Sequence, residues 1–301
     1  MASVNTEFYE QYRHLLFSIA YRMLDSAMEA EDMVQEAFLR YENSRDKDIQ
    51  LPKAYLTTIV TRLCLDQLKS AKTQREQYIG IWFPEPIFTQ QAATSEPEQA
   101  ETLSMAFMVL LENLSPVERA VFLLREVFDY DYAAIAKIVD KSEVNCRRYY
   151  HLAKEYLVDR RPRFEPISGD QIKLVQHFLQ AVGEGDIEGL TSLLAEDIVV
   201  YADGGGKVPV ARVPQRGHEA VTRLLLGIFR WATKDMRIEL HDVNGMISVT
   251  VWQADVTIMV MTVEIVDNLI TSIRGVINPD KLVFMTHSPT PPVGSDIPAV
   301  E

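Results

Sequence analysis

Basic side chains gather at two places in the chain where they could contact nucleic acid. Residues 45–75 and 137–163 each carry a net charge of +4, although the 30 basic and 43 acidic side chains of the whole chain give −13. Screening limits the reach of a charge to about 8 Å at physiological salt, so phosphate binding depends on local charge. The two segments are either two contacts with one nucleic acid or two ordinary solvated helix faces.

The first basic segment is predicted to form a helix from Pro52, a residue favoured at the first helical position. Cations along one face of this helix could follow a phosphate backbone, and Thr57, Thr58 and Thr61 could hydrogen-bond bases or phosphates. A solvated face is the alternative. The candidate DNA contacts on this helix are Arg62, Asp66, Lys69, Lys72 and Arg75.

The second basic segment has the pattern of a helix-turn-helix. A short helix is predicted at Tyr132–Val139, a turn at Asp140–Ser142, and a longer helix from Ser142 to near Val158. Arginine can read guanine with two hydrogen bonds in the major groove, and asparagine can read adenine. In the longer helix, the residues with the spacing of a buried face are Cys146, Tyr150, Ala153 and Leu157. The candidate DNA contacts are Ser142, Asn145, Arg147, Arg148, His151 and Lys154.

A further polar group has two interpretations. A capping box at Ser26 predicts the start of a helix. On this helix Asp32, Gln35 and Glu36 share a face, which is either solvated or an acidic docking surface for a basic partner.

The glycine-rich segment Asp203–Lys207 also has two interpretations. Its glycines would let backbone amides approach an anion, but the segment does not match a phosphate-binding P-loop, and the alternative is a flexible turn.

Catalytic and metal-binding patterns are absent from the sequence. The six histidines and two cysteines form no close ligand pair, and no nucleophile-elbow, zinc-peptidase or dinucleotide-binding fingerprint occurs. We therefore expect no metal, no cofactor and no enzymatic activity. The alternative is an enzyme or small-ligand sensor with a pocket in the C-terminal part of the chain. The acids and bases available to it are His218, His241, Asp255 and Glu264.

The chain is long enough for two or three small domains. No apolar run approaches the roughly eighteen residues of a membrane span, and the polar N-terminus is unlike a signal peptide, so we expect a cytoplasmic protein without membrane contact. An apolar stretch, Tyr78–Pro86, is typical of a linker segment that docks on another surface. The predicted division is 1–75, helical; 76–103, linker; 104–160, helical; 161–169, linker; 170–287, α+β; and 288–301, flexible tail.

The α+β prediction depends on a change of pattern at residue 170. Helical periodicity comes first and long β-rich runs follow, with the hairpin signal Asn244-Gly245 between two of them. The expected helices are near 172–182, 186–194 and 217–233, and the expected strands are Met236–Leu240, Met246–Trp252, Val256–Val266 and Leu269–Ile277.

In this order, the features resemble a bacterial sigma factor of the extracytoplasmic-function group. Ala30–Leu39 resembles the region-two helix that docks on the coiled coil of the polymerase β′ subunit. Leu65–Ala71 resembles the end of the helix that engages and melts the −10 element. Leu114–Arg119 and Ser142–Leu157 resemble region four, which reads the −35 element.

A more specific resemblance is to the SigJ-type subgroup, which carries a fused SnoaL-like C-terminal domain. Tyr78–Pro86 is similar to its Trp-Leu-Pro-Glu-Pro linker motif, with Phe83 in place of leucine. Asp203–Lys207 and Asn278–Leu282 match two signatures of its C-terminal domain. The interdomain regulatory contacts that this resemblance implies are Trp82, Pro84, Asp203, Gly204, Gly205, Gly206, Lys207, Asn278, Pro279, Asp280, Lys281 and Leu282.

The resemblance implies a multidomain fold of two all-α sigma domains and a cone-like α+β domain of the nuclear-transport-factor-2 type. It implies a transcription initiation factor that contacts the β′ coiled coil through Asp32, Gln35 and Glu36, contacts the β flap, and recognises promoter DNA. Its C-terminal domain would control activity in place of a separate anti-sigma factor. A ligand sensor or an enzyme stays open as the alternative.

Overall fold

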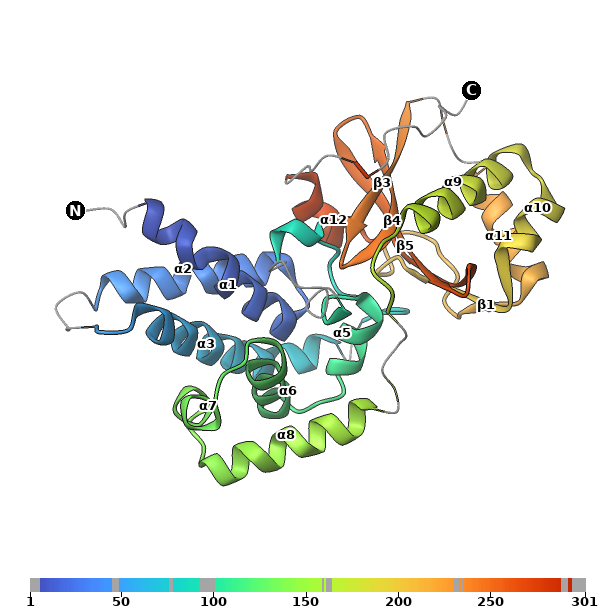
Figure 1. Ribbon diagram of the computed structural model, residues 1–301. Coiled ribbons are helices and arrows are strands. Elements are labelled where there is room, and N and C mark those ends of the chain that lie inside the picture. Colours follow the sequence, from blue (N-terminus) through green and yellow to red (C-terminus); the bar gives the residue numbers. More distant parts are fainter. Residues whose placement is uncertain are drawn as a thin grey trace. The chain divides into compact units, whose positions relative to one another are not determined.

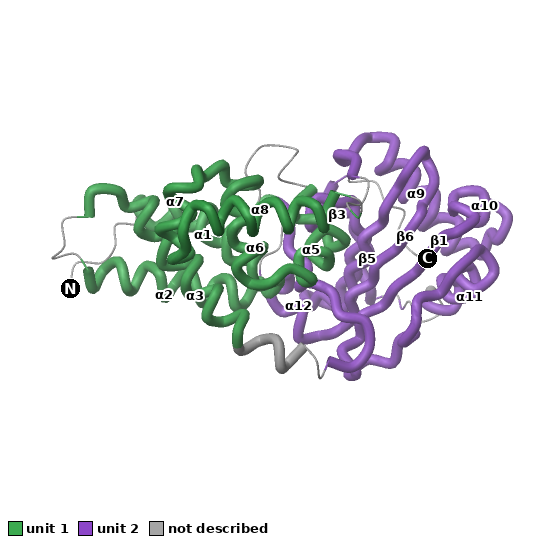
Figure 2. Tube along the Cα trace, turned by 90° about the horizontal axis from the view of Figure 1, so that it is seen from below, with its two compact units in different colours: residues 1–77, 90–162 green, residues 78–89, 163–301 purple. Residues whose placement is uncertain are grey.

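The structure is a computed structural model that describes residues 6–44, 49–75, 78–92, 101–158, 160, 164–229, 233, 235–287 and 292–293 (Figure 1). The chain divides into two compact units, Met1–Gln77 with Gln90–Pro162, and Tyr78–Thr89 with Arg163–Glu301 (Figure 2). Residues 78–89, here called the linker segment, therefore belong to the second unit. The predicted order of helical domains followed by an α+β domain is confirmed.

The first unit is helical, and capping residues begin several of its helices, as predicted at Ser26. The hydroxyl of Ser26 accepts the N–H of Glu29, and Ser115 and Glu118 form a reciprocal capping box before Pro116. Its elements are α1 (Thr6–Leu24), α2 (Ala27–Glu42), α3 (Pro52–Arg75), α5 (Met105–Leu111), α6 (Pro116–Phe122), a π-helical turn η2 (Leu123–Val127), α7 (Tyr132–Val139) and α8 (Glu143–Val158). A 3-10 turn, η1 (Thr89–Gln91), follows the linker segment.

The predicted helix-turn-helix is formed by α7 and α8. The carboxylate of Asp131 accepts the N–H of Ala134 at 2.7 Å and begins α7. Asp140 ends this helix with a φ of 54°, the left-handed conformation that commonly terminates helices. The hydroxyl of Ser142 then accepts the N–H of Asn145 at 3.3 Å and begins α8. Helix α7 packs on both α8 and α3.

The second unit packs its helices against one mixed sheet (Figure 1). Its elements are α9 (Gly169–Glu184), α10 (Ile187–Leu193), β1 (Leu194–Asp203), β2 (Gln215–Arg216), α11 (His218–Phe229), β3 (Met236–Val243), β4 (Met246–Gln253), β5 (Val256–Val266), β6 (Leu269–Val276) and α12 (Pro279–Thr286). The strand order is β2-β1-β6-β5-β4-β3, with β1 parallel to β6. Asn244 and Gly245, with φ values of 53° and 72°, form the tight turn between β3 and β4.

Two elements of the second unit differ from the prediction. β1 was not expected as a strand, because Glu196 and Asp197 interrupt its apolar pattern and its parallel partner β6 lies far along the chain. α12 was not expected either, although the side chain of Asn278 caps it and Pro279 occupies its first turn. Most of the predicted tail lies outside the described residues; within it, Val293 donates its N–H to the carbonyl of Leu240 at 2.7 Å.

Candidate DNA, polymerase and linker-binding sites

Helix α8 presents the predicted DNA-reading side chains to solvent. Its buried side is formed by Cys146, Ala153 and Leu157, as the core spacing predicted, whereas Tyr150, also predicted there, is half-buried. Arg147 is 2.9 Å from the carboxylate of Glu143, which holds the guanidinium along the helix surface. The exposed candidates are Ser142, Asn145, Arg147, Arg148, His151 and Lys154. Their role in DNA binding stays a prediction.

Helix α3 is partly covered by α7 within the first unit. Arg62 donates from Nε to the carbonyl of Ile138 at 2.9 Å and from Nη2 to the carbonyl of Lys137 at 2.8 Å. Its guanidinium thus caps the C-terminal end of α7, where a cation is favoured. Thr57 is fully buried and hydrogen-bonds the hydroxyl of Tyr130 at 3.0 Å.

The other α3 candidates fall into three groups. Asp66 and Lys69 are exposed and pair with each other at 2.8 Å. Lys72 and Arg75 belong to α3, but their side chains lie outside the described part of the chain. Thr61 is fully buried. Thr57 and Thr61 are therefore both inaccessible to DNA in this conformation, and their contact with DNA stays a prediction.

A buried group of charges links α1 to α6, and sequence reasoning missed it. Arg119 forms an ion pair with Asp25 in which the side chains are 2% and 0% exposed, and it donates to the carbonyl of Arg22 at 2.9 Å. Arg22 donates to the hydroxyl of Thr102 at 3.1 Å. Burial lowers the pKa of Arg22 to about 9, which still leaves it charged at neutral pH. These bonds tie the first helices to those that follow the linker.

The predicted polymerase-docking face lies on α2. Asp32 and Gln35 are exposed, and Glu36 is half-buried. Glu36 accepts from Nε of Arg40 at 2.7 Å, one turn further along the helix. The face is therefore accessible in the described first unit, and its role in docking stays a prediction.

In the second unit the linker segment is bound at two places, and the first is centred on Asp203. This carboxylate, at the end of β1, is fully buried. Its Oδ2 accepts the N–H of Phe83 at 2.9 Å and pairs with Nζ of Lys281 at 2.7 Å, while Oδ1 accepts the hydroxyl of Tyr78. Lys281 also donates to the carbonyl of Phe83. We call Tyr78, Phe83, Asp203, Asn278 and Lys281 the Asp203 cluster.

Further interactions complete the Asp203 cluster. Asn278 donates from Nδ2 to the hydroxyl of Tyr78 at 3.0 Å. Burial and the carboxylate of Asp203 hold the pKa of Tyr78 well above its ordinary value, so the phenol remains a donor. The ammonium of Lys281 lies 4.2 Å from the ring centroid of Trp82, a cation–π distance. Trp82, which was predicted to dock the linker, therefore contacts Lys281 within the second unit.

Three glycines after Asp203 allow close packing around this cluster. A Cβ on Gly206 would lie 3.2 Å from Cβ of Ile79, and one on Gly205 would lie 2.6 Å from Cγ of Asn278. A Cβ on Gly204 would meet a valine side chain at 2.9 Å. The close approach of Ile79, Asn278 and a valine therefore explains the three glycines without a bound phosphate.

The remaining residues of the linker motif and of the two C-terminal signatures lie outside the Asp203 cluster and differ in their exposure. Lys207 forms an exposed ion pair with Asp280, in which the side chains are 52% and 64% exposed. Pro84 and Leu282 are buried, and Pro279 opens α12. Their part in regulation stays a prediction.

The second binding place is the β3–β4 turn, here called the Asn244 turn (Asp242, Asn244 and Gly245). The N–H of Ile87 donates to Oδ1 of Asn244 at 3.1 Å, and the N–H of Asn244 donates to the carbonyl of Ile87 at 3.0 Å. Thr89 accepts the N–H of Gly245 at 2.7 Å and donates to Asp242. Burial raises the pKa of this aspartate. Sequence reasoning predicted the turn but not its contact with the linker segment.

We expect Gly205→Ala to loosen the linker segment, because the new Cβ displaces Asn278 from Tyr78. Gly217→Ala is the matched control, since its φ of 76° is equally left-handed but nothing lies within 4 Å of an added Cβ. Both variants carry the backbone cost of about 1–2 kcal/mol. Only Gly205→Ala should speed amide hydrogen exchange of the linker segment, by about tenfold or more. Equal exchange in the two variants would contradict this assignment.

The acids and bases considered for an enzyme are dispersed over the second unit. His218 contacts backbone carbonyls, His241 hydrogen-bonds a buried threonine hydroxyl, Glu264 pairs with an arginine, and Asp255 lies exposed in a turn. Among the described residues, no group of histidine, cysteine, aspartate or glutamate is arranged to hold a metal ion. In the same part of the chain, no helix combines the length and apolar character that crossing a membrane requires.

Comparison with known proteins decides the family. Family models for Sigma-70 region 2, Sigma-70 region 4 and a SnoaL-like domain match residues 8–74, 104–157 and 175–276. The ECF RNA polymerase sigma factor SigJ of Mycobacterium tuberculosis is 38% identical over 227 residues, which cover 73% of this chain and 72% of that protein. The chain belongs to the extracytoplasmic-function (ECF) sigma factors.

A second relative and a solved structure support the same family assignment. A probable ECF sigma factor, SigI of the same organism, is 31% identical over 212 residues, 68% of this chain and 72% of that protein. The crystal structure of Mycobacterium tuberculosis SigJ matches with a TM-score of 0.72 and 28% identity, covering 95% of this chain and 99% of that one. The resemblance to the SigJ-type subgroup is confirmed. This sigma factor binds core RNA polymerase and directs promoter-specific transcription initiation.

Proposed function

We propose that the C-terminal domain controls this sigma factor by holding the linker segment, so that no separate anti-sigma factor is required. The observation that carries the proposal is the double attachment of the segment to the Asp203 cluster and the Asn244 turn. The Asp203–Lys281 ion pair within the first attachment has side chains only 0% and 8% exposed. Release of the linker segment is then the regulated step.

The separation of the two promoter elements supports this proposal. Their names, −10 and −35, place them about 25 base pairs apart, which is roughly 85 Å along the DNA axis. Residues 76–103 reach at most about 95 Å when fully extended. Binding of residues 78–89 to the C-terminal domain restricts that extension, so release of the segment favours contact with both elements.

The contact between α3 and α7 supports the same conclusion from within the first unit. Arg62 of α3 is hydrogen-bonded to the last carbonyls of α7, so the helices proposed to serve the two elements touch each other. A compact domain of 100 residues has a radius of gyration of about 13 Å, so two touching domains cannot bridge roughly 85 Å. Simultaneous contact with both elements therefore requires this contact to open.

The proposal assigns the predicted surfaces to partners in the cytoplasm, where core polymerase acts. Asp32, Gln35 and Glu36 dock on the β′ coiled coil, and region four contacts the β flap. The proposed −10 contacts are Arg62, Asp66, Lys69, Lys72 and Arg75. The proposed −35 contacts are Ser142, Asn145, Arg147, Arg148, His151 and Lys154.

Run-off transcription tests the control by the C-terminal domain. Promoters are first located by mapping transcript 5′ ends in cells that overproduce the full chain. At limiting core polymerase, the full-length Lys281→Met variant should then give several-fold more product from these promoters than the wild type, because its linker segment is released. Lys207→Met should match the wild type, since it removes an exposed ion pair of the same C-terminal domain.

Two results would contradict the proposal. Equal product from the wild type and Lys281→Met would show that the Asp203 cluster does not restrain initiation. Less product from Lys281→Met, with unchanged binding to core polymerase, would show that the bound linker segment is the active form.

A further inference from the structure

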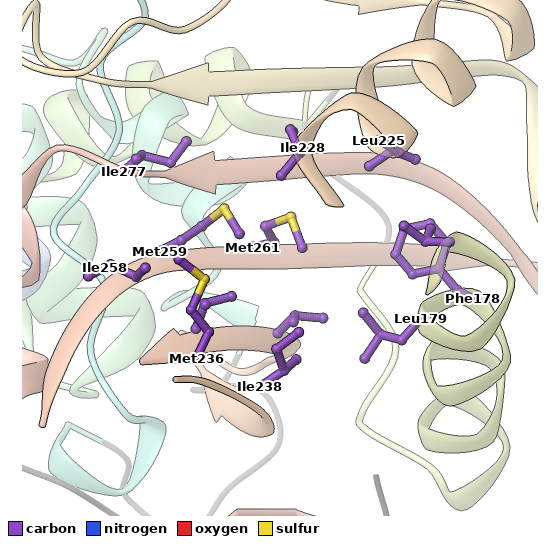
Figure 3. Close-up of a pocket in the computed structure, with 13 residues that line it drawn as sticks. Phe178, Leu179, Leu225, Ile228, Met236, Ile238, Ile258, Met259, Met261 and Ile277 are labelled. Atoms are coloured by element: carbon purple, nitrogen blue, oxygen red, sulfur yellow. The ribbon is translucent and has the colours of Figure 1, made fainter. Parts of the chain in front are cut away.

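The second unit contains an apolar hollow that the proposed function does not use (Figure 3). It has a volume of about 180 Å³ and is lined by side chains of α9, α11, β3, β4 and β5 and by Ile277 after β6. Every lining residue is phenylalanine, leucine, isoleucine, valine or methionine. Among the described residues, the hollow is therefore a cavity without a charged or hydroxyl-bearing lining side chain.

Fully buried core side chains and half-buried side chains together line the hollow. Phe178 and Val249 are 1% and 0% exposed and belong to the core of the second unit. Met236, Met259 and Met261 also line the hollow and are half-buried (Figure 3). Methionine is unbranched and polarizable, so these side chains can adapt to the shape of a bound molecule. The arrangement is that of a pocket, since a flat surface would lack the fully buried lining of Phe178 and Val249.

The lining decides which molecules fit. A charged or strongly polar molecule would lose its hydrogen bonds to water without replacing them, which is costly. An apolar molecule meets no such cost, and an apolar protein cavity of about 150 Å³ holds benzene. Among the described residues, the lining offers no general acid or base of the kind that the enzyme alternative needs.

We propose that this hollow binds a small, uncharged, apolar molecule of about one or two rings. The volume excludes a helix of a partner protein, which is about 10 Å wide, and favours a small molecule. The proposal is independent of the control of the linker segment.

Methyl NMR of the full-length protein tests this proposal with naphthalene as the probe. Naphthalene should shift the methyl signals of Met236, Met259 and Met261 in a saturable way and leave other methionine signals unchanged. The charged analogue 2-naphthoate, which has the same rings, should bind about tenfold more weakly or less, because its carboxylate loses water in the hollow.

Two tryptophan variants make the test specific. Met259→Trp fills the hollow and should weaken naphthalene binding by about tenfold or more. Val256→Trp lies on the same strand, 53% exposed and outside the hollow, and should bind naphthalene like the wild type. An unchanged far-ultraviolet circular dichroism spectrum establishes that both variants are folded.

Three results would overturn the proposal. The first is no saturable shift of the three methionine signals, as expected if another part of the chain or a second copy fills the hollow. The second is equal binding of naphthalene and 2-naphthoate. The third is undiminished binding to a folded Met259→Trp variant.

Discussion

Lys281→Met should release the linker segment from the second unit. The variant keeps an unbranched side chain but leaves the buried carboxylate of Asp203 without its cation. Removal of one partner from a buried ion pair costs about 3–5 kcal/mol. Amide hydrogen exchange of the linker segment should therefore accelerate by roughly a hundredfold or more, as measured by mass spectrometry on the full-length protein.

The control for this experiment is Lys207→Met, in the neighbouring signature. Its ion pair with Asp280 is 52% and 64% exposed, and such pairs contribute at most about 1 kcal/mol. Chymotrypsin supplies an independent readout, because it cleaves after aromatic residues and the linker segment contains Tyr78 and Trp82. If the linker segment is equally protected from exchange and cleavage in Lys281→Met and Lys207→Met, the Asp203–Lys281 pair does not hold the segment in place.

Arg119→Met should destabilise the first unit by a similar amount. The substitution leaves Asp25 buried and charged without its partner, and it removes the donor to the carbonyl of Arg22. We expect a loss of about 3–5 kcal/mol in the free energy of unfolding of the helical unit. Urea unfolding followed by far-ultraviolet circular dichroism measures this change.

The comparison variant is Arg40→Met, also in the first unit. Arg40 pairs with Glu36 on the surface of α2, where the side chains are 54% and 42% exposed. The exposed pair should contribute at most about 1 kcal/mol. Urea midpoints that coincide in the two variants would refute a structural role for the buried Arg119–Asp25 pair.

Local signals in the sequence predicted much of the fold. The helix-turn-helix followed from the turn at Asp140–Ser142, the capping residue Ser142 and the apolar spacing on either side, because caps and periodicity depend on neighbouring residues. The β3–β4 hairpin followed from Asn244-Gly245, whose left-handed φ values suit a two-residue turn. The exposed face of α8 followed in the same way, since helical spacing fixes which side chains share a side.

Contacts between distant residues could not be predicted from spacing. Arg119 and Asp25 look like ordinary helix-surface charges in the sequence, and only the packing of α6 against α1 buries them. The resemblance singled out Asp203 and Lys281, but their hydrogen bonds to Phe83 emerged only from the fold. The burial of Thr57 was not predicted, because the sequence does not show that Tyr130 packs against α3.

The order in which a ribosome makes this chain has a consequence for the Asp203 cluster. The hydrogen bond between Asn278 and Tyr78 joins residues 200 positions apart. Translation at about 5–20 residues per second therefore separates the synthesis of these two residues by roughly 10–40 s. Both sigma domains are complete by residue 162, before Asp203, Asn244 and Asn278, which bind the linker segment, have been made. Every new molecule thus passes once through a state in which its sigma domains are made and its linker is unbound.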